Sequence, residues 1–179
     1  MAISLRAVLR PYSMLGAIVL IALAGVICGF YLSEWFFSGR APAQPIAFSH
    51  KIHAGDHQIP CLHCHLYAED SKVAGVPPVA KCMGCHSNIA TDRPLIVALN
   101  DYWEKQEPIP WVKVHDLPDF VHFSHKRHVR AGLACNTCHG EVEQMEVLRR
   151  VSNLQMGWCI QCHQQNAVRF GTDCMTCHK

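Results

Sequence analysis

The sequence has no long run of basic residues, and the formal charge of its 179 residues is only +2 at pH 7. Proteins that bind DNA or RNA usually carry a cluster of lysine and arginine side chains that contacts the phosphates. Because the sequence has no such cluster, no nucleic-acid partner is expected. The function has to be sought in other features of the chain.

Charge is absent altogether between residues 11 and 33, a stretch of 23 mostly apolar residues. About 20 such residues suffice to cross the hydrocarbon core of a bilayer. Arg6 and Arg10 precede the stretch without any acidic residue, and this excess of positive charge places the N-terminus in the cytoplasm. We therefore predict a cytoplasmic segment at residues 1–10 and a transmembrane anchor at residues 11–37.

A cleaved signal peptide is the alternative interpretation of this stretch. Its apolar region is usually only about 7–15 residues long and is followed by small residues at the cleavage site. Here the bulky residues Trp35, Phe36 and Phe37 follow instead, as is typical of a membrane interface. We expect a single-pass anchor, retained in the lipid of the cytoplasmic membrane, with the rest of the chain on the periplasmic side. Cys28, inside the anchor, is interpreted as a small apolar residue.

Cysteine, by contrast, is abundant, and ten of the eleven cysteines fall in five copies of the motif CxxCH. This motif attaches c-type haem: each thiol forms a thioether to the porphyrin, and the histidine becomes the proximal ligand of the iron. We predict five covalently bound haem c groups. The ten cysteines that would hold them are Cys61, Cys64, Cys82, Cys85, Cys135, Cys138, Cys159, Cys162, Cys174 and Cys177. The five proximal ligands would be His65, His86, His139, His163 and His178.

Zinc sites and a disulfide framework are the alternative uses of paired cysteines. Neither requires a histidine directly after the second cysteine, and all five motifs have one. A disulfide framework would also leave thirteen histidines in 179 residues unexplained. Haem attachment accounts for both features.

The region after the anchor is too short for a conventional core around each haem. It offers roughly 28 residues per motif, and small domains bury little of their surface. We therefore expect the porphyrins to form much of the core. The predicted fold is one N-terminal transmembrane helix plus a small multihaem cytochrome c domain with little regular structure, in which short helices and loops pack around five haems. One such helix is expected at residues 94–106, because a proline suits its first turn.

A six-residue pattern occurs twice in this region. Phe48-Ser-His50-Lys-Ile-His53 recurs 75 residues later as Phe123-Ser-His125-Lys-Arg-His128, and two CxxCH motifs follow each copy. The first histidine precedes the first cysteine by 11 residues in one copy and by 10 in the other. We predict an internal duplication of a two-haem unit. The expected boundaries are a linker at 38–47 and a haem domain at 48–179, with repeat units 48–90 and 123–168 and the fifth haem at 169–179.

The repeated histidines are the best candidates for distal iron ligands. His50 and His53 are neighbours in a helical turn, as are His125 and His128. Two such side chains cannot easily bind one iron from opposite sides, so each pair is expected to serve two different haems.

The fifth distal ligand is less clear from the sequence. His115 is predicted for this role, with Met156 and His122 as alternatives. His57 and His63 are expected to bind no iron, because one lies in a glycine-containing turn and the other inside a CxxCH motif.

The paired histidines and the CxxCH motifs together resemble the class III multihaem cytochromes. The stretches WVKVHDLPDFVHFSHKRHV, CNTCHGEVEQMEV and MGWCIQCH bring the resemblance closer. With one anchor and five motifs, the chain is similar to the pentahaem cytochrome subunit of alternative complex III over most of residues 46–178. Its short C-terminus leads us to expect no docking extension of the kind found in longer relatives.

This resemblance implies an electron-transfer subunit with no catalytic residue of its own, in a membrane complex that oxidises quinol. The implied partners are integral-membrane quinol-oxidising subunits and an iron–sulfur subunit of the same complex. The implied acceptor is periplasmic: a monohaem cytochrome c, a cupredoxin or an oxidase.

Three other functions remain to be weighed. A self-contained anchored quinol dehydrogenase would need a quinol site within this chain. A subunit of a periplasmic oxyanion reductase would need an open coordination position on one iron, and the supply of spare histidines argues against it. A plain periplasmic carrier is disfavoured by the expected anchor.

Overall fold

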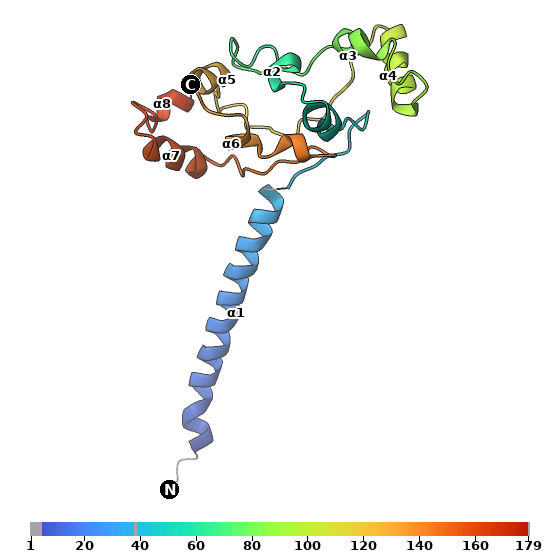
Figure 1. Cartoon of the computed structure of the whole chain (residues 1–179). Helices are drawn as coiled ribbons and strands as arrows, with labels where there is room; N and C mark the ends of the chain where they lie inside the picture. The colour runs from blue at the N-terminus through green and yellow to red at the C-terminus, as the bar shows by residue number, and fades with distance from the viewer. Residues whose placement is uncertain (1–4, 38, 179) are drawn as a thin grey trace. The chain divides into compact units, whose positions relative to one another are not determined.

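The structure is a computed structural model that describes residues 5–37 and 39–178 (Figure 1). Side chains are described at residues 14–33 and 39–178. The side chains of the predicted cytoplasmic segment 1–10, and of Trp35, Phe36 and Phe37 at the far end of the predicted anchor, therefore lie outside the described part. The chain divides into two units, which meet between residues 38 and 39. Throughout the two backbone ranges described, every regular element is a helix and no strand occurs.

The N-terminal unit is the single helix α1 (Leu5–Phe37). Within it, residues Met14–Ser33 are long and apolar enough to cross a membrane, and their side chains are exposed. A helix that is apolar all round and has no packing partner of its own needs an apolar surrounding. The helix thus fits a membrane anchor.

The C-terminal unit consists of short helices joined by long irregular segments (Figure 1). Its helices in chain order are the π-helix η1 (Lys51–Asp56), α2 (Cys61–Cys64), α3 (Val79–His86), α4 (Pro94–Glu104), α5 (His125–Arg130), α6 (Asn136–His139), the 3₁₀-helix η2 (Val142–Gln144), α7 (Met156–Gln165) and α8 (Cys174–Cys177). The helix expected at residues 94–106 is α4. It starts at Pro94 as predicted and ends two residues early, because Gln106 has a left-handed backbone with φ of 53°.

The apolar core of this unit is small. Its one cluster joins α3 and α4 to the flanking segments through Ile46, Val79, Met83, Leu99 and Ile109. Among the side chains described, none is less than 2% exposed. So little burial cannot offset the conformational entropy of about 140 ordered residues, which fits the expectation that prosthetic groups supply much of the core.

Backbone hydrogen bonds join segments that are far apart in the sequence. The N–H groups of His125 and Lys126 donate to the carbonyls of Lys72 and Ser71, each at 3.0 Å. Elsewhere the N–H of Lys51 donates to the carbonyl of Met145 at 3.0 Å. Each predicted repeat unit is thereby tied to the other one, and the histidines at the start of η1 and α5 are held in place.

Candidate haem sites

The cysteine pairs lie on or at the start of short helices. Each CxxC spans one turn, for example in α2 and α8. Residues three apart in a helix lie on the same face, so the two thiols can face one porphyrin. All eleven cysteines are free. Burial raises the pKa of the thiols of Cys82 and Cys159, which keeps both neutral at pH 7.

The proximal histidines are held by hydrogen bonds at Nδ1. Four of them contact backbone carbonyls: His65 at Gly75 (2.6 Å), His86 at Ile89 (3.0 Å), His163 at Gly171 (2.6 Å) and His178 at Phe120 (3.2 Å). A ring nitrogen that donates to a carbonyl fixes the tautomer and leaves Nε2 for a metal. The fifth, His139, contacts the Nε2 atom of His115 instead, at 3.3 Å.

Three pairs of rings combine one expected distal and one expected proximal histidine. The ring centres are 6.1 Å apart for His53 and His86, 6.3 Å for His125 and His139, and 6.0 Å for His128 and His163. Two imidazoles that bind one metal from opposite sides, each through a bond of about 2 Å, place their centres roughly 6 Å apart. The residues present therefore fit irons held between two imidazoles.

His50 has no such ring contact, but its surroundings suit a ligand. Its Nδ1 is buried without a hydrogen-bond partner among the described residues, and such a group calls for an explanation. Burial, and then repulsion from His65, His53 and His139, lowers its pKa to about 4. The ring is therefore neutral at pH 7, and a neutral imidazole is the form that binds a metal.

A phenylalanine orders each pair of distal candidates. Phe48 stacks on His53 with ring centres 4.4 Å apart and meets His50 edge-on at 4.9 Å. Phe123 does the same with His128 at 4.5 Å and His125 at 4.8 Å.

Backbone carbonyls complete the support of these distal candidates. The Nδ1 atoms of His53 and His128 contact the carbonyls of Ser49 and Ser124, each at 2.8 Å. Sequence reasoning gave Phe48 and Phe123 no role, although the repeated F-S-H-x-x-H pattern contained the signal.

The candidates for the fifth distal ligand lie in different places. His115 contacts His139, and no ring contact joins it to His178 among the described residues. His122 is tied to the fifth motif through its backbone N–H, which donates to the carbonyl of Cys177 at 2.7 Å. Met156 begins α7 and is 65% exposed. His57 and His63 are both exposed.

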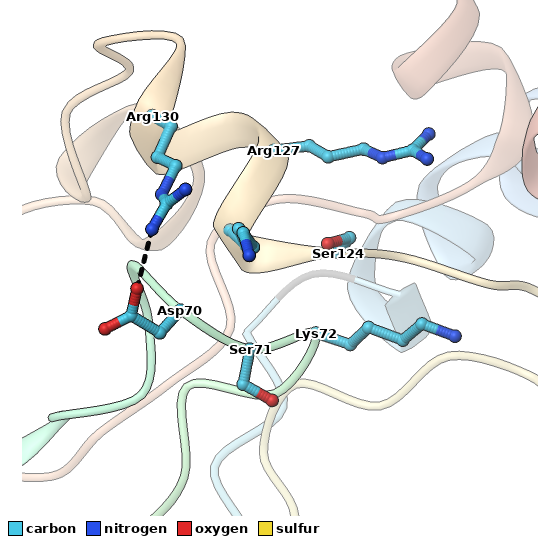
Figure 2. Close-up of a pocket in the computed structure, with 7 residues that line it drawn as sticks. Asp70, Ser71, Lys72, Ser124, Arg127 and Arg130 are labelled. Carbon is cyan, nitrogen blue, oxygen red and sulfur yellow. Dashed lines mark hydrogen bonds and ion pairs between the residues drawn. The ribbon is translucent and has the colours of Figure 1, made fainter.

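A cationic hollow of about 730 Å³ lies beside His125, lined by Asp70, Ser71, Lys72, Ser124, Lys126, Arg127 and Arg130. Arg130 pairs with Asp70 at 2.7 Å, whereas the side chains of Lys72 and Arg127 extend away from this pair (Figure 2). The Nδ1 of His125 contacts the carbonyl of Lys72 at 3.0 Å. The hollow thus places positive charge next to a candidate ligand, where it attracts carboxylates. The sequence gave no sign of it, since its two halves are about 50 residues apart.

The zinc alternative finds no support. Among the residues described, no group of three or more histidine, cysteine, aspartate or glutamate side chains is arranged to hold a metal ion by itself. Paired thiols with a single neighbouring imidazole suit a porphyrin-bound iron better than a tetrahedral zinc ion.

Comparisons with known proteins agree with this chemistry. Residues 121–179 match the family model described as cytochrome c7 and related cytochrome c, so this part of the chain is similar to that family. Similarity to that family agrees with covalent c-type haem.

The chain is also similar to the menaquinone reductase, multiheme cytochrome c subunit, of Nitratidesulfovibrio vulgaris. The two are 34% identical over 119 residues, which make up 64% of this chain. The match covers 56% of that relative, so this chain spans little more than half of its length.

Proposed function

We propose that the chain is a membrane-anchored pentahaem c-type cytochrome that relays electrons between a quinone-reactive membrane complex and periplasmic carriers. The observation that carries the proposal is the set of three histidine pairs with ring centres 6.0–6.3 Å apart, each joining a CxxCH histidine to one from the repeated motif. Bound haem supplies reversible one-electron chemistry. The protein holds each haem, orients its ligands and sets its potential.

The proposed ligand pairs are His50 with His65, His53 with His86, His125 with His139, and His128 with His163. The first pair is assigned by the duplication. It is supported by His65, which after burial lowers the pKa of His50 more than the other neighbouring histidines do. The matching contacts of Phe48 and Phe123 support the duplication itself. Because His125 and His128 lie on one turn of α5, two haems would be held close together, as electron transfer requires.

The proposed placement is a single pass through the cytoplasmic membrane with the haem domain on the periplasmic side, where the ten thioether cysteines would be loaded. The proposed complex resembles alternative complex III: quinol-oxidising membrane subunits and an iron–sulfur subunit deliver electrons, and a periplasmic carrier or oxidase accepts them. No acidic residue, basic residue or histidine lies between Arg10 and Glu34. This supports a quinol site outside this chain, since quinol oxidation releases protons that a nearby base must take up.

A second candidate function is the same relay running in the opposite direction. The relative from Nitratidesulfovibrio vulgaris is named a menaquinone reductase, an activity in which electrons pass to the quinone. In that case periplasmic donors would reduce the haems, and the membrane partners would pass the electrons on to menaquinone.

The test has two parts, both on the full chain. Mass spectrometry of the denatured protein is expected to show five haem additions, and fewer would contradict the pentahaem proposal. Stopped-flow mixing of a quinol analogue with the complex is expected to reduce the haems quickly, whereas the isolated subunit stays oxidised. Fast reduction of the isolated subunit would favour a self-contained quinol dehydrogenase. Fast oxidation of pre-reduced haems by quinone, without the forward reaction, would favour the menaquinone-reducing direction.

A further inference from the structure

His139 differs from the other four proximal histidines in what its Nδ1 contacts. Those four face backbone carbonyls, which no substitution can remove, whereas His139 faces the side chain of His115 at 3.3 Å. The contact of His139 is also longer than all four carbonyl contacts, the longest of which measures 3.2 Å. The haem bound by His139 would therefore be the one whose proximal ligand is supported by a replaceable side chain.

The ring geometry separates the two faces of His139. On one side the His125 ring lies parallel to it, at 8° and 6.3 Å between centres, the spacing expected across an iron. The His115 ring instead approaches edge-on, at 75° and 4.4 Å, and faces Nδ1 of His139. His115 is too close to His139 for an iron between the two rings, and the contact uses the Nε2 atom that an axial ligand would normally offer to iron.

The proposed ligation decides which of the two histidines donates the hydrogen bond and which accepts it. If the Nε2 of His139 binds iron, its proton remains on Nδ1, which must donate. The Nε2 of His115 then accepts, so the proton of His115 is on its own Nδ1. The residue next to His115, Val114, is buried and so anchors the backbone at this point.

We propose that His115 is a positioning residue for His139: it accepts the Nδ1–H hydrogen bond and thereby tunes the potential of the haem that His139 and His125 bind. This rests on the proposed haem ligation and replaces the role of fifth distal ligand expected for His115. An acceptor at Nδ1 makes the ligating imidazole more basic, which stabilises ferric iron. Loss of the acceptor should therefore raise the potential of this one haem.

The experiment compares four variants of the full-length, haem-loaded protein. His115→Ala removes the acceptor, and His115→Phe removes it while keeping an aromatic ring in place. His115→Gln retains a side-chain acceptor. His57→Ala is the matched control, since it removes an exposed imidazole that is not a proposed ligand. Haem content is counted by mass spectrometry, spin states are read by electron paramagnetic resonance, and potentials are measured by spectroelectrochemical titration.

The expected result is that the Ala and Phe variants keep the haem content and the low-spin signals of the wild-type protein while the potential of one haem moves upward. The Gln variant should return part of that shift, and the His57→Ala control should show none. A new high-spin signal in the Ala or Phe variant would overturn the proposal, because it would make His115 an axial ligand. Five unchanged potentials would overturn it as well.

The remaining variants still decide the question if one variant does not take up all of its haems. If His115→Ala loses haem, the Phe and Gln variants decide, and equal potentials in these two would contradict the proposal. If the wild-type chain itself carries fewer than five haems, the proposed function fails, and this outcome is visible before any variant is compared.

Discussion

The segments 48–90 and 123–168 share the contacts of a phenylalanine with two histidines but differ in the helix that carries the histidines. In both, a phenylalanine stacks on the second histidine of the motif and meets the first edge-on, with ring distances that agree within 0.1 Å. Yet the first segment forms the π-helix η1, and the second forms the α-helix α5. The arrangement of the phenylalanine and its two histidines is thus the same on two different backbones.

One extra residue accounts for the difference. The spacing from the first histidine to the first cysteine is 11 residues in the first segment and 10 in the second. A π-turn contains one residue more than an α-turn, so η1 absorbs the additional residue without moving His50 or His53 relative to Phe48. The arrangement of the phenylalanine and histidine rings is the same in the two segments, whereas the type of helix that carries the histidines differs.

The largest expected effect comes from removing the distal candidates one at a time. His53→Ala and His128→Ala should each turn one low-spin haem into a high-spin one, because each would remove an imidazole opposite a different iron. His50→Ala and His125→Ala should each affect a further, different haem. Electron paramagnetic resonance of the loaded protein reads the result, with His63→Ala as a control that changes no signal. Identical spectra for the two variants of one motif would contradict the two-haem bridging arrangement.

Removing the shared phenylalanine is the next test. Phe48→Ala and Phe123→Ala should each lower the free energy of unfolding by about 2 kcal/mol, less than for a fully buried ring, because both are half-buried. Guanidinium unfolding followed by haem absorption measures the loss. The two losses should be similar, as the ring contacts are. Phe→Leu at the same positions is the control, and it should restore roughly half of the loss. A difference of more than about 1.4 kcal/mol, tenfold in the unfolding equilibrium, between the two alanine variants would show that the segments are not equivalent.

The two helices differ at the fifth residue after the first histidine, which is Gly55 in η1 and Arg130 in α5. A Cβ at Gly55 would collide with the backbone carbonyl of Glu143, where η1 packs against η2. Gly55→Ala should therefore cost about 1–3 kcal/mol. The matching residue, Arg130, makes an exposed ion pair with Asp70, so Arg130→Ala should cost less than about 1 kcal/mol. The same unfolding titration compares them, and equal losses would mean that η1 can move away from η2 at little cost.

The smallest effect concerns the turn after each helix. Gln58 adopts a left-handed backbone, with φ of 53°, where the second segment has Gly132, with φ of 82°. Gln58→Gly should raise the free energy of unfolding by about 0.5–1 kcal/mol, since glycine adopts this conformation without strain. Gly132→Ala should destabilise by about 1 kcal/mol for the converse reason. Opposite signs in the unfolding titration are expected, and a destabilised Gln58→Gly variant would show that the glutamine side chain matters more than the strain.

The covalent chemistry of this protein could be predicted from local sequence. The CxxCH spacing, the F-S-H-x-x-H repeat and the uncharged span near the N-terminus are patterns within a few consecutive residues, so their chemical meaning does not depend on the fold. The same holds for α4, whose start at Pro94 is a property of proline. The small number of residues per motif likewise indicated that the apolar core would be small.

Tertiary structure decided which groups meet across long distances in the chain. Nothing in the sequence places His115 against His139, the carbonyl of Lys72 against His125, or that of Phe120 against His178. These contacts join segments 24, 53 and 58 residues apart. They depend on how irregular segments pack where no sheet or long helix fixes their register. A ligand motif needs only its own neighbours, whereas the partner behind each imidazole is chosen by the fold.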